Sequence, residues 1–98
     1  MVLFNYGTYE GALARTLGRL AHLLGRSDAA IAHFDTALSI TERLKAPYWI
    51  ARTQLDYADL LRDVRRNDEA AQLVGQALET AKTFGFAALE SRATTFPA

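Results

Sequence analysis

The fold of this chain is decided by residues 24–38, which read LGRSDAAIAHFDTAL. A polar turn at 25–28 separates two stretches in which apolar residues recur every three or four positions, the spacing of an amphipathic helix. Ser27 is a good N-cap for the second stretch, and Asp28 places a negative charge at the N-terminal end of its dipole. These residues therefore predict two helices joined by a tight turn.

Each predicted helix carries one apolar face, on which we expect the core to form. On the first helix this face consists of Leu13, Leu17, Leu20, Ala21 and Leu24. On the second helix it consists of Ile31, Phe34, Ala37, Leu38 and Thr41. Pro47 then separates the second helix from the next one, because proline interrupts helical hydrogen bonding.

The same pattern recurs forty residues later. A shift of forty superposes six identical pairs: Leu20 and Leu60, Arg26 and Arg66, Asp28 and Asp68, Ala30 and Ala70, Ala37 and Ala77, and Leu38 and Leu78. A third helix is predicted over 49–64, with an apolar face that includes Leu55, Tyr57, Ala58 and Leu61. A second turn at 65–68, with Asn67 as its N-cap, leads to a fourth helix that ends at the C′ glycine Gly85.

No segment shows the sustained alternation of a β-strand. A period of forty residues built from two helices is typical of helical solenoids. We therefore predict an all-α fold of tandem antiparallel helix hairpins, arranged as a right-handed α-solenoid with four main helices.

The spacing of small residues resembles that of the tetratricopeptide repeat family. In the first unit the matching residues are Gly18, Gly25, Ala30, Phe34 and Ala37. In the second unit they are Ala58, Ala70, Val74 and Ala77, and Arg65 replaces the turn glycine. The resemblance implies that paired helices cross closely where Gly18 meets Ala30, and that Phe34 fills the wedge between neighbouring hairpins.

Longer runs resemble the C-terminal repeat region of large bacterial regulators, in which an ATPase is joined to a winged-helix or nucleotide-cyclase domain. The runs are residues 17–21, 24–28, 32–38, 46–53 and 56–58. The sequence departs from that pattern where an extra residue separates Pro47 from Trp49. The resemblance implies a regulatory part of a larger signalling or transcription protein, in which the chemistry belongs to other domains.

We expect residues 1–98 to form one helical-repeat domain. Residues 1–8 match the tail of a preceding unit, and residues 9–46 form the first repeat. Residues 47–86 form the second repeat, and residues 87–98 are the start of a further unit or a C-terminal cap.

Composition narrows the class of function. The 11 basic and 11 acidic residues cancel, so we expect no nucleic-acid partner. No apolar run approaches the roughly 20 residues that span a bilayer, so we expect no membrane partner. The chain has no cysteine, which excludes disulfide frameworks and thiolate zinc sites and fits a cytoplasmic protein.

The sequence contains no nucleotide-binding, zinc-protease or nucleophile-elbow motif. His22 and His33, with Asp28 or Asp35, are possible metal ligands, but surface roles are the better interpretation. Ion pairs with nearby arginines explain the carboxylates better than acid–base chemistry does: Glu10, Glu42, Asp56, Asp59 and Asp63. We therefore predict a non-catalytic protein with no catalytic residue, no metal and no cofactor.

For two aromatic residues of the third helix, Tyr57 and Trp49, a structural role is favoured over a functional one. Tyr57 precedes the packing residue Ala58, so we expect it to be partly buried, with a carboxylate as one possible partner for its hydroxyl. Trp49 follows Pro47, and we favour an anchor of the inter-repeat connection over a ligand-stacking role.

In the family that the sequence resembles, the first helix of each hairpin lines a concave groove. Carried over by position, the candidate peptide groove consists of Arg15, Arg19, His22, Arg52, Leu55, Asp59 and Arg62, with Ala12, Leu23 and Asp63 beside them. Its four arginines form a basic strip that suits an acidic or C-terminal carboxylate peptide of a protein partner. The alternative is a solvated arginine face paired to Asp59 and Asp63.

Two repeats leave two end faces uncovered, so self-assembly as a homodimer is the alternative function. The candidate self-association residues are Phe4, Tyr6, Tyr9, Phe84, Phe86, Leu89 and Phe96, with Leu3 beside the first three. We expect association at micromolar or higher concentration. The main prediction is a protein-interaction or scaffolding module.

Overall fold

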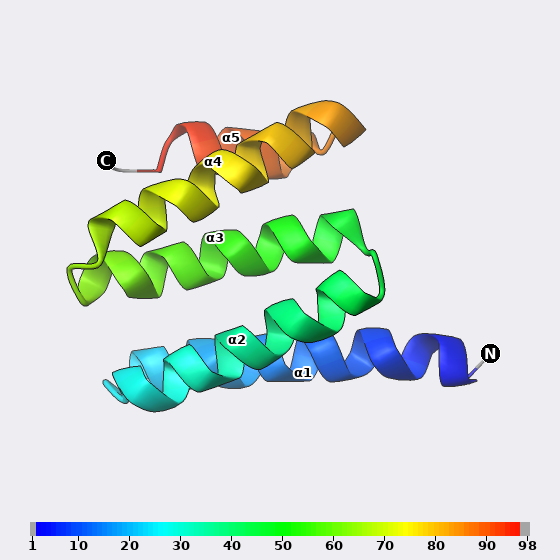
Figure 1. The fold of residues 1–98 in the computed structure, drawn as a ribbon, viewed down its shortest axis with the longest axis horizontal. Helices are drawn as coiled ribbons and strands as arrows, with labels where there is room; N and C mark the ends of the chain where they lie inside the picture. The colour runs from blue at the N-terminus through cyan, green and yellow to red at the C-terminus, as the bar shows by residue number, and fades with distance from the viewer. Residues whose placement is uncertain (1, 97–98) are drawn as a thin grey trace.

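The computed structural model describes the backbone of residues 2–96 and the side chains of residues 10–96. Within that part every regular element is a helix (Figure 1). The helices are α1 (Val2–Leu23), α2 (Ser27–Arg43), α3 (Pro47–Asp63), α4 (Asn67–Phe84) and α5 (Ala87–Thr94). The predicted all-α fold is confirmed, with a fifth helix in the segment expected to start a further unit.

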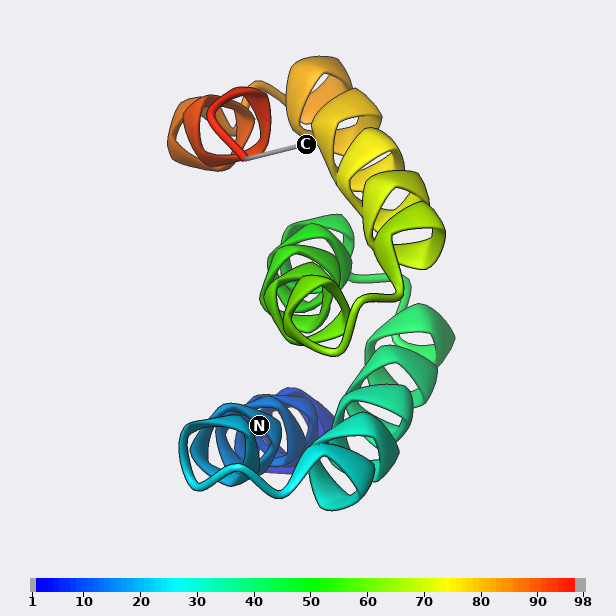
Figure 2. The ribbon, with the colours of Figure 1, turned by 90° about the vertical axis from the view of Figure 1, so that its left-hand side faces the viewer.

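The helices form tandem antiparallel hairpins in two layers. Helices α1 and α2 make the first hairpin, and α3 and α4 make the second. Figure 2 shows α1, α3 and α5 side by side in one layer, with α2 and α4 in the other. Helix α1 runs unbroken from Val2, so no turn marks the expected boundary between residues 8 and 9.

The four turns between helices share one backbone geometry at intervals of twenty residues. Four residues have a positive φ: Gly25 at 75°, Lys45 at 52°, Arg65 at 65° and Gly85 at 76°. In each turn the next N–H donates to a carbonyl five positions back: Arg26 to Ala21, Ala46 to Thr41, Arg66 to Leu61 and Phe86 to Ala81. This Schellman-type bond ends each helix at the same point of the period. The following helices therefore begin at residues 27, 47, 67 and 87.

The two predicted N-caps are wrong by one residue. Arg26 and Arg66 occupy the N-cap positions of α2 and α4, without a side-chain capping bond. Because the turn closes at residues 26 and 66, Ser27 and Asn67 already lie inside their helices. The prediction for Gly85 is confirmed, since it adopts the left-handed conformation that ends α4.

Small residues on α1 hold the first hairpin together. A Cβ atom at Gly18 would lie 3.1 Å from the ring of Phe34, so glycine is what allows this ring to pack against α1. The atoms nearest to that position belong to Phe34, not to Ala30 as expected. In the second hairpin the equivalent positions hold Ala58 and Val74. Ala58 is larger than Gly18, and Val74 is smaller than Phe34, so the two changes in size compensate each other.

Phe34 also joins the two hairpins. It is fully buried, and its ring stacks on Tyr57 of α3 with the centroids 5.3 Å apart. The Tyr57 hydroxyl donates a hydrogen bond to Oδ1 of Asp35 at 2.9 Å. Burial, together with the Asp35 carboxylate, raises the pKa of Tyr57 to about 12. The prediction that Phe34 fills the wedge is confirmed, and the partner of the Tyr57 hydroxyl is the carboxylate that was one of the expected possibilities.

The predicted core face of α1 is wrong for its four leucines and right for Ala21, whereas the faces predicted for α2 and α3 are right. Leu13, Leu17, Leu20 and Leu24 are 44%, 38%, 51% and 65% exposed. The buried face of α1 consists instead of Gly11, Ala14, Gly18 and Ala21, with Arg15 beside them. Small side chains let two helix backbones approach closely, so this face packs against α2 and the leucines turn outwards.

Candidate functional site

A groove runs between α1 and α3, in the layer formed by α1, α3 and α5 (Figure 2), which we call the inner layer. It encloses about 350 Å³ and is lined by Arg19, His22 and Leu23 from α1 and by Asp56, Asp59, Arg62 and Asp63 from α3. The three carboxylates recur at three- and four-residue steps, so they lie on one face of α3. The site is therefore formed by two helices that share no turn.

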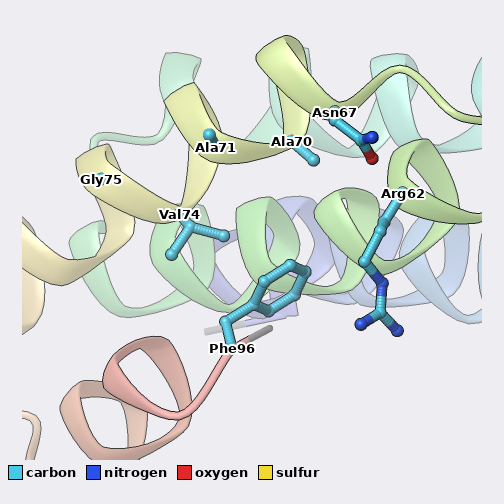
Figure 3. Close-up of a pocket in the computed structure, with 7 residues that line it drawn as sticks. All are labelled: Arg62, Asn67, Ala70, Ala71, Val74, Gly75 and Phe96. Carbon is cyan, nitrogen blue, oxygen red and sulfur yellow. The ribbon is translucent and has the colours of Figure 1, made fainter. Parts of the chain in front are cut away.

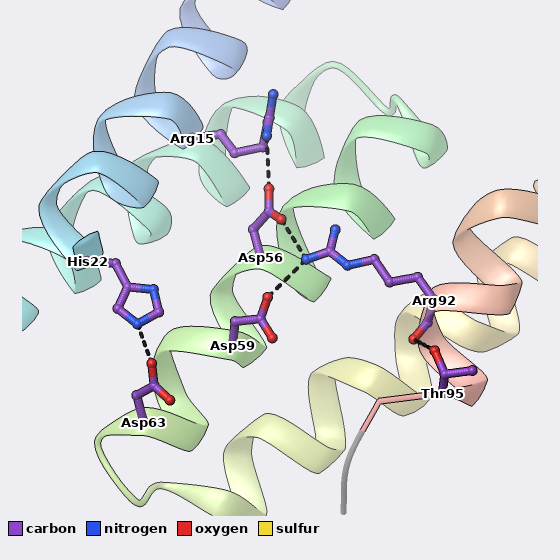
Figure 4. A network of polar contacts seen from close by, with 7 residues as sticks. All are labelled: Arg15, His22, Asp56, Asp59, Asp63, Arg92 and Thr95. Carbon is purple, nitrogen blue, oxygen red and sulfur yellow. Dashed lines mark hydrogen bonds and ion pairs between the residues drawn. The ribbon is translucent and has the colours of Figure 1, made fainter.

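Asp56 connects all three helices of the inner layer (Figure 4). Its Oδ2 atom accepts a hydrogen bond from Nη1 of Arg15 on α1 at 2.9 Å. Its Oδ1 atom accepts one from Nη2 of Arg92 on α5 at 2.7 Å, and Arg92 also reaches Oδ2 of Asp59 at 3.1 Å. Arg15 and Asp56 are each only 7% exposed, so this ion pair is shielded from solvent.

The third groove carboxylate is paired as well. Nε2 of His22 lies 2.6 Å from Oδ2 of Asp63, which connects the C-terminal turns of α1 and α3 (Figure 4). Every carboxylate that lines the groove therefore already has a cationic or histidine partner from within the chain.

Two groove arginines have no such partner. Within residues 10–96, neither Arg19 nor Arg62 forms an ion pair with a carboxylate. The Arg62 guanidinium lies 5.3 Å from the ring centroid of Phe96, a cation–π contact that leaves its charge uncompensated. The groove therefore combines carboxylates that already have a partner with two arginines that form no ion pair among the described residues.

The structure brings together only some of the residues expected in the groove. Arg19, His22, Asp59 and Arg62 line it. Leu55 is fully buried and Arg15 is buried against Asp56, so the expectation that these two side chains face a free groove is wrong. Both point into the interface between helices because their neighbours on adjacent helices cover them.

Arg52 lies outside the groove, in contact with Trp49. The guanidinium carbon of Arg52 lies 5.6 Å from the Trp49 ring centroid, and that of Arg15 lies 5.9 Å from it. Trp49 thus anchors the first turn of α3 between two arginines. Sequence reasoning predicted that Asp56 pairs with arginines, which Arg15 and Arg92 do, but it did not place Asp56 in the groove. It missed Arg92, although the register that aligns Arg92 with Arg52 is visible in the sequence.

The candidate self-association residues have different environments. Phe84 is exposed, whereas Phe86 is half-buried and packs against Tyr48 and Phe84. Leu89 is buried in the core between α3, α4 and α5, so the expectation that it is available at the surface is wrong. The side chains of Phe4, Tyr6 and Tyr9 lie outside the described residues.

Phe96 borders a second, more apolar pocket of about 230 Å³ (Figure 3). Its other lining residues are Arg62, Asn67, Ala70, Ala71, Val74 and Gly75. Helix α5 ends at Thr94 and covers only part of α4, so Ala71 and Gly75 stay exposed, whereas Ala70 is buried.

Within the described part of the chain, no group of three or more metal-ligating side chains comes together. In the same part, no helix has the length and hydropathy needed to cross a bilayer.

A family model described as tetratricopeptide repeat matches residues 9–83. No curated protein and no solved structure gives a match. The matched range covers both helix hairpins and the groove between them, and proteins built from this repeat generally mediate protein–protein interaction. The chain belongs to the tetratricopeptide repeat family.

Proposed function

We propose that this protein is a non-catalytic interaction module that binds an acidic peptide segment of a protein partner in the groove between α1 and α3. The observation that carries the proposal is the charge state of the groove. Its three carboxylates are paired within the chain, whereas Arg19 and Arg62 are not. An acidic side chain or a terminal carboxylate can therefore bind both arginines without displacing an existing ion pair.

The groove also offers apolar contact beside the two charges. Leu23 lies at its rim and is 81% exposed. A short peptide with a carboxylate next to an apolar side chain would satisfy both features. Charge-assisted hydrogen bonds would give specificity, and burial of Leu23 would add affinity.

Titration with a fluorescent glutamate-rich peptide tests this proposal. We expect binding that weakens with added salt and that falls about tenfold in Arg19→Ala and in Arg62→Ala, the loss of one charged hydrogen bond. Arg43→Ala is the matched control, because Arg43 is an exposed arginine at the end of α2, away from the groove. Equal affinity in all four proteins, or no binding that responds to salt, would overturn the proposal.

A second proposed function, self-association, is favoured by the number of exposed large apolar side chains. Of the eight such residues among the described side chains, five lie within residues 13–24: Leu13, Leu17, Leu20, Leu23 and Leu24. Apolar surface in one place is typical of an interaction face rather than of scattered surface residues. Light scattering across a concentration series tests it, and a monomer mass at about 100 μM would count against it.

We further propose that the module serves a larger bacterial signalling or transcription regulator that works in the cytoplasm. The runs at 24–28 and 46–53, which resemble the repeat regions of such regulators, support this assignment. The genomic reading frame tests it. An ATPase or cyclase domain encoded in the same frame is the expected result, and a frame without either would contradict it.

A further inference from the structure

Four leucines form an exposed strip along α1 and the residue that follows it. Leu13, Leu17, Leu20 and Leu24 are separated by four, three and four residues, and they are 38–65% exposed. This is the heptad spacing of a coiled-coil seam, which keeps apolar side chains on one line along a helix. The flanking heptad positions are Ala14, Thr16, Ala21 and Leu23, so no charge borders the strip between its ends.

The internal repeat shows that a helix normally covers this face. A shift of forty residues places the strip on Thr53, Tyr57, Leu60 and Val64 of α3. The first three are buried and Val64 is half-buried, with Tyr57 stacked on Phe34 of α2. The strip on α1 is thus equivalent to the face by which α3 packs against the preceding hairpin. A repeat face that stays in contact with water usually carries polar residues, not leucines.

We infer that the strip is a dimer interface, covered by the α1 strip of a second copy of this chain in antiparallel orientation. The inference rests on the self-association proposed above and gives it a location. A heptad line is self-complementary, since two such lines related by a twofold axis interdigitate. Among residues 10–96 the other exposed large apolar residues are Leu23, Leu44, Tyr48 and Phe84. Leu23 lines the groove, and Tyr48 and Phe84 both pack against Phe86, so these residues form no comparable line along one helix.

Opposite charges at the two ends of the strip set the orientation. Glu10 stands one heptad before Leu17, and Arg26 follows Leu24. Within residues 10–96 neither forms an ion pair. Arg66, the equivalent of Arg26, pairs with Glu69, but Ala29 occupies that place in the first repeat. Antiparallel packing brings Glu10 of each copy towards Arg26 of the other, whereas parallel packing brings like charges together.

Sedimentation equilibrium of the full chain tests the location. Because a strip of four leucines makes a small interface, we expect a dissociation constant in the micromolar range. A charge in the centre of an apolar seam abolishes pairing, so Leu17→Glu and Leu20→Glu should remain monomeric up to about 300 μM. Leu44→Glu is the matched control, since Leu44 is 43% exposed and lies off the strip. Circular dichroism checks that all three variants keep the wild-type helix content.

The outcomes separate the two proposals. A wild-type monomer at the highest concentration overturns self-association and the strip together, and means that a different helix covers α1. Dimerisation that survives Leu17→Glu and Leu20→Glu, or that Leu44→Glu disrupts equally, keeps self-association but overturns the strip.

Exchanging the charges of Glu10 and Arg26 tests the antiparallel orientation of the two copies and leaves the four leucines unchanged. Glu10→Arg and Arg26→Glu should each weaken the dimer by about tenfold, because each single change places like charges opposite one another twice. The double variant restores the pairing with reversed sign and should dimerise like the wild type. Single variants that dimerise normally would overturn the antiparallel arrangement.

Discussion

The carboxylate of Asp56 accepts a hydrogen bond from the buried guanidinium of Arg15, 2.9 Å away on a different helix and 41 positions earlier in the chain. The same carboxylate accepts a second bond from Arg92 of α5. One acidic side chain therefore connects α1, α3 and α5. Because this pairing occupies one of the three carboxylates that line the groove, it also bears on what kind of ligand the groove can accept.

Replacing Asp56 should destabilise the fold strongly. Asp56→Ala leaves Arg15 buried without a counter-charge, and we expect the free energy of unfolding to fall by about 3 kcal/mol. Asp59→Ala should cost less than about 1 kcal/mol, because Asp59 is half-exposed and Arg92 keeps its bond to Asp56. Urea denaturation measures both. Equal losses in the two variants would contradict the central role of Asp56.

The contact between Gly18 and Phe34 predicts a coupled pair of substitutions. Gly18→Ala should destabilise the wild type by about 1 kcal/mol, because crowding against the ring outweighs the gain in helix propensity. In a Phe34→Val background, which reproduces the Ala58 and Val74 pair of the second repeat, the same change should stabilise by about 1 kcal/mol. A double-mutant cycle in urea measures the coupling, and additive effects would show that the two residues do not compete for space.

The turn geometry predicts that glycine is favoured at residue 65. Arg65 has a φ of 65°, a conformation that costs an ordinary side chain energy but glycine little. Arg65→Gly should therefore stabilise the protein by about 0.5 kcal/mol, and raise the melting temperature by about 3 °C. The reverse change Gly25→Ala should lower it. A drop in melting temperature for Arg65→Gly would mean that this turn does not limit stability.

The raised pKa of Tyr57 predicts that the folded protein loses stability at high pH. The pKa of this side chain is about 12 in the folded protein and about 10 in an unfolded chain. Between these values the unfolded chain loses a proton that the folded protein keeps, so stability falls as pH rises from about 10 towards 12 and is unaffected below that window. Chemical denaturation of the wild type and of Tyr57→Phe gives the difference. A wild type that loses no more stability than Tyr57→Phe over this range would contradict the shift.

Helices and turns could be predicted well because their signals are local. The alternation of apolar stretches with turns at 25 and 65 predicts the hairpins, and the shift of forty predicts that they repeat. The N-caps were misplaced because a good capping side chain at Ser27 does not decide the cap when a backbone bond closes the turn one residue earlier. Side-chain chemistry alone could not reveal that bond.

The surface of α1 could not be predicted because this helix has two faces that suit packing. Large leucines and small residues such as Gly18 both recur at helical spacing, and only the partner helix decides which face it covers. The burial of Arg15 has a similar cause, since it depends on Asp56 in another hairpin. Arg19 and Arg62 do line a pocket, on the helix faces that the family register assigns to a groove, and their role in binding a peptide stays a prediction.

The most direct test of the proposed function is a reversal of charge at the groove. Two labelled peptides of equal length, one glutamate-rich and one lysine-rich, are titrated into the wild type and into the double variant Arg19→Glu/Arg62→Glu. Free arginines beside paired carboxylates predict that the wild type prefers the glutamate-rich peptide and that the variant prefers the lysine-rich one. An unchanged preference, or equal affinity of the wild type for both peptides, would contradict the account.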